Sequence, residues 1–264
     1  MATNKVDEQD YLATLFPSSE EDENDPSAMS LVDHLEELRW RIFKSLIAIV
    51  VGAIVAFIFR GQIINFLQLP LPKVAADSLT HGKLVVNGIT EGFTVFLMIS
   101  IAAGFILALP VVLYQTWAFI SPGLLEKEKK YAVPFIFIGI ILFVAGIALG
   151  FIVLQYPVQW LVTFASANFA ELVTADSYFT FVAFFMLAFG IVFELPLVLT
   201  FLAKVDLITV QTLTKKRATS HIGMWIAATI LTPGADFYSP IFLGVAMSFL
   251  YELSIIFIKF TTKK

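Results

Sequence analysis

The chain has 264 residues, of which 58% are hydrophobic and 14% are charged, and its formal net charge is −4. Soluble domains have about 45–50% apolar and about 25% charged residues, so the composition excludes an ordinary soluble protein and predicts an integral membrane protein. At about 20 residues for each membrane-spanning helix, the chain has room for several helices with short loops and no large soluble domain.

The N-terminal segment, residues 1–29, is predicted to be a disordered tail because it is rich in Asp and Glu and poor in apolar residues. It lacks the basic start, apolar core and small-residue cleavage site of a signal peptide, so the first membrane helix is expected to direct insertion. We expect a membrane domain over residues 30–260 and a short basic tail at residues 261–264.

Six apolar runs within that domain are predicted to be membrane-spanning helices. In chain order they are Ile42–Phe59, Val95–Phe119, Ala132–Tyr156, Tyr178–Ala203, Ile222–Leu231 and Ile241–Ile258. The charged segment 33–41 has leucines at helical spacing, which predicts an amphipathic helix at the membrane surface. We expect loops after Arg60, from Gln159 to Asp176 and from Lys204 to Ser220, with Pro157 closing the third run.

The fifth run is shorter than the about 20 residues that cross a bilayer. Either its helix starts earlier, near Ala218, or the bilayer is thinner there. The Lys and Arg residues favour counting it as a crossing, because six crossings leave only Arg60, Lys73 and Lys83 on one side of the membrane. The positive-inside rule then places both termini in the cytoplasm.

Glu194 is the most informative residue because it is a lone carboxylate inside an apolar run. A charged side chain at the centre of a bilayer costs about 2.5–3.5 kcal/mol on insertion scales, so such a residue usually faces a protein interior or a partner. Pro196 frees a backbone carbonyl nearby, and the pair is predicted to form a polar notch. The alternative is a glutamate satisfied by a neighbouring helix of the same chain.

Further carboxylates lie near the predicted interfaces. Glu36, Glu37 and Glu128 fall on the cytoplasmic side, where two fixed carboxylates suit a ligand with two guanidinium groups. Their spacing alone favours the alternative of ordinary solvated helix charges, such as a pair between Glu37 and Arg41 and one between Glu128 and a nearby Lys. Asp236, between the last two runs, is predicted to cap the sixth helix or to bond to the opposite loop.

Other classes of function have less support in the sequence. The chain has no cysteine and only scattered histidines, so no metal site is expected, and no nucleotide-binding motif is present. A secondary transporter with Glu194 as its proton carrier would need other polar groups at midplane and an internal repeat. An intramembrane enzyme would need a paired acid, a Ser–His arrangement or metal ligands at depth.

Four motifs together resemble the TatC family, the signal-peptide receptor and core subunit of the twin-arginine protein translocase. They are His34–Arg41 (HLEELRWR), Tyr114–Pro122 (YQTWAFISP) followed by Glu128, Phe189–Pro196 (FGIVFELP) and Leu231–Gly234 (LTPG). The resemblance implies an all-α integral membrane protein with six transmembrane helices in a concave, glove-shaped arrangement and both termini cytoplasmic. It covers the chain from about Ser30 to Phe260.

The resemblance also implies roles for individual residues, and it reverses the preference for plain solvated charges on the cytoplasmic side. Glu37 and Glu128 match the carboxylates that hold the paired arginines of the signal peptide, and Arg39, Phe119 and Pro122 match their surroundings. Glu194, beside Pro196, matches an intramembrane glutamate that meets the small single-span subunits. The exported-side loops contain two further matches, which are Pro70 and Asp236.

The implied partners are twin-arginine signal peptides of folded precursor proteins, small single-span (TatA/TatB-like) subunits, membrane lipid and further copies in a receptor complex. No enzyme activity, cofactor, metal or nucleic acid is implied, and transport is expected to use the proton gradient. The acidic tail resembles that of cyanobacterial or plastid members, so a thylakoid or a plasma membrane is expected. Two departures from the family pattern are an extra residue at Gly234-Ala235 and Ala246 in place of proline.

Overall fold

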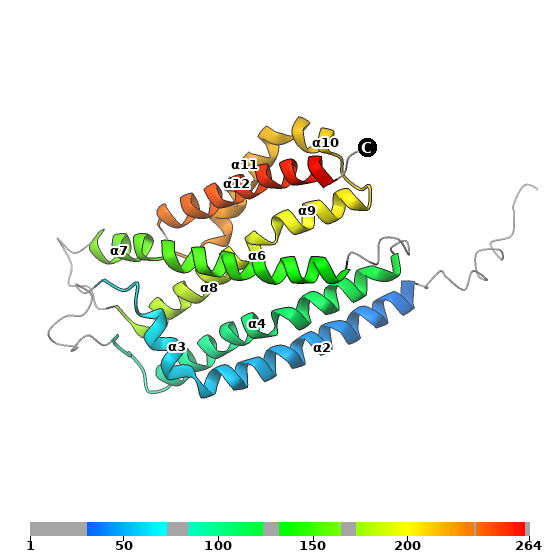
Figure 1. Cartoon of the computed structure of the whole chain (residues 1–264). Helices are drawn as coiled ribbons and strands as arrows, with labels where there is room; N and C mark the ends of the chain where they lie inside the picture. Colours follow the sequence, from blue (N-terminus) through cyan, green and yellow to red (C-terminus); the bar gives the residue numbers. More distant parts are fainter. Residues whose placement is uncertain (1–30, 73–83, 124–131, 165–172, 235, 262–264) are drawn as a thin grey trace, which may run out of the picture. The chain divides into compact units, whose positions relative to one another are not determined.

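The computed structural model describes residues 31–72, 84–123, 132–164, 173–234 and 236–261 (Figure 1). The predicted acidic tail at 1–29, Glu128 and residues 262–264 lie outside the described residues. Contacts divide the chain into two units, residues 1–40 and residues 41–264, and the helix packing below is that of the second unit.

The described residues form helices joined by turns and short irregular segments, and they include an isolated parallel bridge between Val85 and Thr174. The elements are α2 (Leu31–Ile58), α3 (Arg60–Leu67), α4 (Glu91–Ile120), η2 (Ser121–Gly123), α6 (Ala132–Val153), α7 (Gln155–Phe164), α8 (Ala175–Phe193), α9 (Leu195–Lys204), α10 (Val210–Lys215), α11 (Arg217–Leu231) and α12 (Tyr238–Thr261). The prediction of an all-α membrane protein is thereby supported.

Five segments of the described chain are long and apolar enough to cross a membrane. They are Val32–Ile58, Glu91–Ile120, Val133–Phe164, Ala175–Lys204 and Tyr238–Phe260. Helix α11, the predicted fifth crossing, begins at Arg217 and has 15 residues, so the earlier start was correct. At 1.5 Å per residue it is about 22 Å long, still shorter than a hydrocarbon core of about 30 Å.

Three stretches that were predicted to be loops contain helices, so those predictions were wrong. Helix α3 directly follows α2, α7 lies beyond the third apolar run, and α10 precedes α11. Pro157 was expected to end the third run, but it is the third residue of α7. Proline is tolerated in a first helical turn because the N–H that it lacks has no partner there in any helix.

The fourth apolar run is also interrupted, because α8 ends at Phe193 and α9 begins at Leu195. Pro196 is the second residue of α9, a position that suits its fixed backbone angle. The backbone N–H of Glu194 donates to the Ile191 carbonyl at 3.0 Å, and the Glu194 carbonyl accepts from the Val198 N–H at 3.0 Å. Glu194 therefore lies at a break between two helices rather than inside one.

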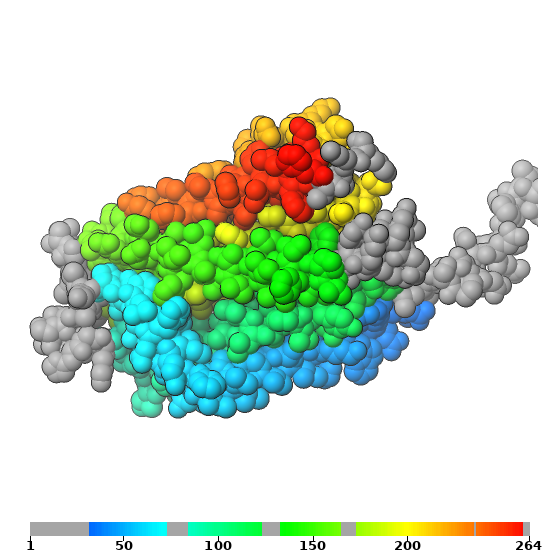
Figure 2. Space-filling view, in the orientation of Figure 1, coloured from blue at the N-terminus to red at the C-terminus, as the bar shows by residue number. Residues whose placement is uncertain are grey.

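The core of the second unit is built around α8, which packs against α4, α6 and α12. Val182 and Phe185 on α8 are fully buried, as is Leu243 on α12. On the face seen in Figure 2, side chains of α6 lie between those of α4 and α12. Large apolar side chains along α2 are exposed, among them Val50 and Ile54, as expected for a surface in contact with lipid.

Helices α2 and α4 approach each other through backbone atoms at Gly52 and Gly104. A Cβ atom built on Gly104 would lie 2.4 Å from the Ala53 nitrogen, and one on Gly52 would lie 2.6 Å from the Gly104 carbonyl oxygen. Real Cβ atoms do not approach other atoms this closely, so glycine is required on both helices. Contacts of this kind between small residues are typical of helix pairs in membranes, where the backbones can pack closely.

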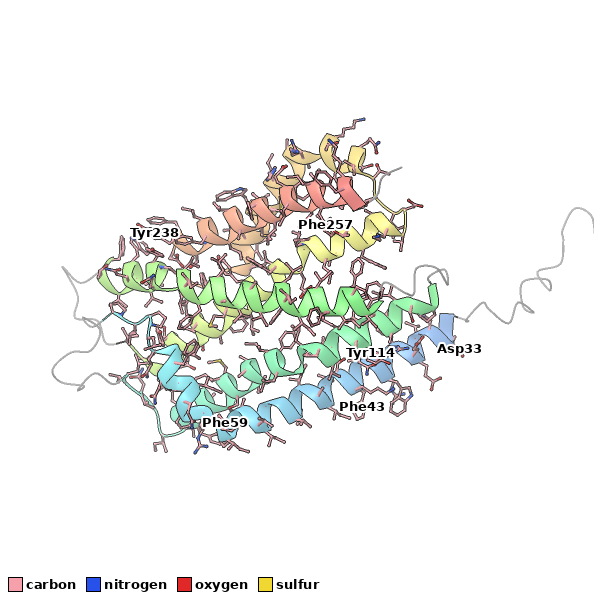
Figure 3. The ribbon with its side chains drawn as sticks, in the orientation of Figure 1. Asp33, Phe43, Phe59, Tyr114, Tyr238 and Phe257 are labelled. Atoms are coloured by element: carbon pink, nitrogen blue, oxygen red, sulfur yellow. The ribbon has the colours of Figure 1, made fainter. Side chains whose placement is uncertain are left out.

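The basic residues in the described helix ends lie on the predicted sides, whereas Lys73, Lys83, Lys127, Lys129 and Lys130 lie outside the described residues. The last turns of α4, α9 and α12 and the start of α6 lie at the right in Figure 1, with α10 beside them. Lys204, Lys215, Lys216, Arg217 and Lys259 belong to helix ends on that side, whereas Arg60 begins α3 at the other end. In Figure 3 Phe257 and Tyr238 mark these two ends on α12. We call them the basic end and the opposite end.

Candidate functional site

Glu194 is held at the α8–α9 break, and its carboxyl group is enclosed. The residue is half-buried, but both carboxyl oxygens are inaccessible to solvent and have no hydrogen-bond partner among the described residues. A Cβ atom on Gly139 of α6 would lie 3.2 Å from Glu194 Oε2, so α6 passes directly beside the carboxyl. The alternative of a glutamate satisfied by a neighbouring helix of the same chain has no support in the described residues.

An unpaired carboxyl in apolar surroundings is costly, since an unsatisfied buried polar group costs about 1–3 kcal/mol. Such groups in native proteins call for a specific explanation, such as a function or a bound partner. The two carboxyl oxygens of Glu194 can therefore accept hydrogen bonds from a polar group of another molecule that reaches the α8–α9 break.

At the basic end, α4 presents the second predicted group of residues. Phe119 is half-buried in the last turn of α4, and Pro122 is exposed in η2. Tyr114, labelled in Figure 3, is exposed and lies five residues before Phe119. Tyr114 and Pro122 thus lie on the outer side of the segment formed by the end of α4 and η2. The inner side of this segment packs against other helices.

The inner face is fixed by Trp117, whose importance the sequence did not indicate. Its ring centroid is 5.2 Å from that of Phe135 on α6 and 5.0 Å from that of Phe201 on α9. Such tilted and edge-to-face aromatic pairs are worth about 0.5–1.5 kcal/mol each beyond their buried area. The cluster holds the basic ends of three helices together directly behind Phe119 and Pro122.

Arg41 and Gln115 make a second contact at the basic end, between α2 and α4. Arg41 Nη1 donates to Gln115 Oε1 at 3.5 Å, and the Arg41 carbonyl accepts from the Ser45 hydroxyl. Gln115 belongs to the motif that contains Tyr114, so the motif supplies both exposed and helix-joining side chains. Sequence reasoning noted Arg41 only as a possible partner of Glu37.

In the first unit, the described residues of α2 carry Glu37 and Arg39. Glu37 is half-buried, and its Oε2 atom lies 3.8 Å from Nδ1 of His34, while Arg39 and Glu36 are exposed. Because Glu128 lies outside the described residues, the structure does not test whether Glu37 and Glu128 form a pair.

At the opposite end, Glu91 joins two helix starts. Its Oε2 atom accepts from the N–H groups of Asn87 and Gly88 at 2.5 and 3.2 Å, and its Oε1 accepts from the Asp176 N–H at 3.3 Å. A carboxylate near a helix N-terminus is favoured by the helix dipole. The same end contains the Val85–Thr174 bridge, so the starts of α4 and α8 are fastened together.

The predicted exported-side residues occupy turns at this end. Pro70 is half-buried in the turn after α3, and just before it the Leu67 carbonyl accepts from the Tyr178 hydroxyl at 2.6 Å. Asp236 is buried, and its Oδ1 accepts from the Ser239 N–H at 2.6 Å. This is the helix cap that was one of the two predicted roles for Asp236.

His221 joins α11 to α12 in a polar cluster that sequence reasoning missed. Its Nδ1 lies 3.1 Å from Ser248 Oγ and its Nε2 lies 3.0 Å from Glu252 Oε1. Arg217 Nη2 pairs with Glu252 Oε2 at 2.8 Å. Two i,i+4 pairs on adjacent helices, Arg217 with His221 and Ser248 with Glu252, were the available signal.

A Ser–His–Glu arrangement raises the possibility of hydrolysis, but this cluster has the geometry of a helix clamp. Ser248 lies well inside α12, where backbone N–H groups are used within the helix, whereas an oxyanion hole needs free donors. The Tyr251 hydroxyl beside it donates to the Leu213 carbonyl at 2.9 Å, which adds α10 to the same contact. The described residues contain no group of His, Asp and Glu that could hold a metal ion.

A cavity of about 720 Å³ lies among α7, the start of α8 and the turn before α12. Val158, Leu161, Ser177, Phe181, Pro233 and Gly234 are among the residues that line it. None of the predicted site residues lines this cavity, but it adjoins the exported-side turn, because a Cβ atom built on Gly234 would lie 3.6 Å from Oδ2 of Asp236.

Comparison with known proteins decides the family. Residues 33–245 match the family model described as Sec-independent protein translocase protein (TatC). The chain belongs to the TatC family. This membership makes it a component of a Sec-independent protein translocase, and it confirms the resemblance inferred from the motifs.

Several TatC relatives match nearly the whole chain. A Sec-independent protein translocase protein TatC of Carboxydothermus hydrogenoformans is 38% identical over 237 residues, which cover 89% of this chain and 95% of the relative. A TatC of Desulforapulum autotrophicum is 36% identical over 239 residues, covering 90% and 86%. A crystal structure of the twin-arginine translocase receptor TatC matches with a TM-score of 0.72 and 33% identity over 87% of this chain and 100% of that one. The multi-pass helical membrane fold is therefore that of TatC.

Proposed function

We propose that this TatC-family protein is the receptor for the twin-arginine signal peptides of folded precursor proteins. The observation that carries the proposal is the match, over 87% of the chain, to a structure described as the twin-arginine translocase receptor. We further propose that the protein works in a cytoplasmic membrane with both termini cytoplasmic, as the sorting of basic residues supports, and that the proton gradient drives transport.

The paired arginines of the signal peptide are proposed to bind Glu37 and Glu128. Each carboxylate can accept two parallel hydrogen bonds from one guanidinium group, a geometry that lysine cannot reproduce. Arg39 is proposed to tune the charge beside Glu37, and Phe119 and Pro122 to form an apolar edge. The Trp117 cluster supports this role because it fixes the end of α4 that presents Phe119 and Pro122.

The small single-span subunits are proposed to bind at the α8–α9 break. Neither carboxyl oxygen of Glu194 has a hydrogen-bond partner in the part of the chain that the structure describes, which supports this role because a polar group on an incoming helix would supply one. Hydrogen bonds between membrane helices are worth about 0.6–2 kcal/mol, enough to select a register and weak enough to be reversible. Pro196 contributes by ending the helical hydrogen-bond pattern at this depth, and Pro70 and Asp236 by shaping the exported-side turns.

We propose no catalytic step, cofactor or metal for this activity. A transporter with Glu194 as its proton carrier has less support, because no polar group of the described residues faces that carboxyl. Hydrolysis at Ser248 lacks an oxyanion site. Signal-peptide binding and helix assembly need only the charges and contacts described above.

The test is the affinity of the purified protein for a signal peptide with Arg-Arg and for the same peptide with Lys-Lys. We expect the wild type to prefer Arg-Arg, and Glu37→Gln and Glu128→Gln each to weaken that preference by about tenfold, the equivalent of about 1.4 kcal/mol. Glu36→Gln is the matched control because Glu36 is the exposed neighbour of Glu37, and it should retain the preference. Equal affinity of the wild type for both peptides would contradict the proposed site.

A further inference from the structure

The Glu194 carboxyl lies in a notch formed by three helices. A Cβ atom built on Gly139 of α6 would lie 3.2 Å from Glu194 Oε2. The same Cβ atom would lie 3.0 Å from Cδ1 of Leu113 on α4 and 3.1 Å from Cδ2 of Leu197 on α9. The carboxyl and two leucine ends therefore meet at the position where any other residue would carry its side chain.

The glycines of α6 serve two different purposes. A Cβ atom on Gly146 would lie 2.6 Å from the Phe189 carbonyl oxygen, and one on Gly150 would lie 3.0 Å from Phe189 Cβ. These two glycines allow α6 to pack closely on α8. At Gly139 the neighbours are the ends of flexible side chains, so a methyl group there displaces side chains while the backbones stay in place.

We propose that Gly139 is a positioning residue for Glu194, and that α6 thereby controls whether the carboxyl can meet a partner helix. With no side chain at 139, the carboxyl fits between α4, α6 and α9 and is covered by Leu113 and Leu197. A partner's polar group reaches it only when α6 moves away or when the carboxyl leaves the notch. The second half of this inference rests on the proposed role of Glu194 in binding the small subunits.

The shelter of the carboxyl can be measured without any partner. Dicyclohexylcarbodiimide enters membranes and modifies carboxyl groups in apolar surroundings, and mass spectrometry locates the adduct. The full chain in phospholipid vesicles should react slowly at Glu194, with Glu194→Gln as the blank. Gly139→Ala should raise the rate about fivefold, which corresponds to about 1 kcal/mol.

Gly223→Ala is the control because it makes the same glycine-to-alanine change inside a helix, α11, where the new methyl group would meet no atom of the described residues within 4 Å. Its rate of modification at Glu194 should stay within about twofold of the wild type. An unchanged rate in Gly139→Ala, an equal rise in Gly223→Ala or rapid reaction of the wild type would each overturn the proposal.

A second variant covers the case in which Gly139→Ala does not accumulate. Leu113→Ala removes part of the cover without crowding the notch, so it should also speed the reaction at Glu194, and an unchanged rate would contradict the shelter. Co-purification of the small subunits tests the proposed function separately. Faster modification with unchanged subunit binding would keep the role of Gly139 and reject that of Glu194.

Discussion

The contact between α2 and α4 leads to a prediction that two glycine-to-alanine variants of α4 can test against each other. In Gly104→Ala the new methyl carbon would lie 2.4 Å from the Ala53 nitrogen and 2.7 Å from the Ala53 Cα. An ordinary contact needs about 3.4–4 Å, so the two helices must separate by about 1 Å. Overpacking of this kind lowers the free energy of unfolding by about 1–3 kcal/mol. The crowded atoms here belong to the backbone, which cannot rotate away as a side chain can.

The same substitution at Gly92, in the first turn of α4, meets no other atom of the described residues within 4 Å. Alanine is favoured over glycine in a helix by up to about 1 kcal/mol, so Gly92→Ala should be neutral or slightly stabilising. The two variants share a helix and a chemical change, and their free energies of unfolding should differ by about 1–4 kcal/mol.

Thermal unfolding in detergent, followed by tryptophan fluorescence, measures this difference. For a chain of this size about 1 kcal/mol corresponds to about 2 °C or slightly more, so Gly104→Ala should melt at least about 2 °C below Gly92→Ala. Equal melting temperatures would refute the backbone contact between α2 and α4. A lower melting temperature for Gly92→Ala would show that the half-buried start of α4 is packed against another segment.

Three further outcomes are expected. Glu194→Ala should leave signal-peptide affinity within about twofold of the wild type and abolish co-purification of the small subunits, because the change removes only an intramembrane acceptor; loss of peptide binding with subunit binding intact would contradict it. Tyr178→Phe should lower the free energy of unfolding by about 1 kcal/mol through the lost hydrogen bond to the Leu67 carbonyl, whereas the exposed Tyr156→Phe should change it little. Glu252→Gln should lower the melting temperature most at low salt, because it weakens the pair with Arg217 at the protein surface, and a loss that is independent of salt would argue against an ionic contribution.

Apolar runs predicted the spans well because length and hydropathy are properties of a local stretch of sequence. The run from Ile241 to Ile258 lies inside α12, and the start of α11 near Ala218 was one of the two stated alternatives. The side of the basic residues in the described helix ends followed from the number of crossings together with the positive-inside rule. Whether a segment can cross the bilayer depends on the length and hydropathy of that segment, so no contact with a distant segment needs to be known.

The features that sequence reasoning missed depend on contacts between distant segments or on the exact register of a turn. Pro157 can either end a helix or begin one, and only the new helix α7 shows which. The His221 clamp needs two helices in register, and the Trp117 cluster needs three. Pro196 was predicted to free a backbone carbonyl, but the helix break at Glu194 was not predicted. The position of its carboxyl beside Gly139 of α6 depends on a contact between helices, which neither residue reveals in the sequence.

Because Glu91 ties the start of α4 to the start of α8, α4 can pivot about this end. Its start is tied to the start of α8 through the Asp176 N–H, and its 30 residues extend about 45 Å. A tilt of about 5° that preserves this tie displaces the far end of α4 by about 4 Å, by the same helix geometry. Because the Trp117 cluster ties this far end of α4 to α6 and α9, a rotation at the opposite end would displace the basic ends of all three helices together, and Phe119 at the proposed peptide site would move with them.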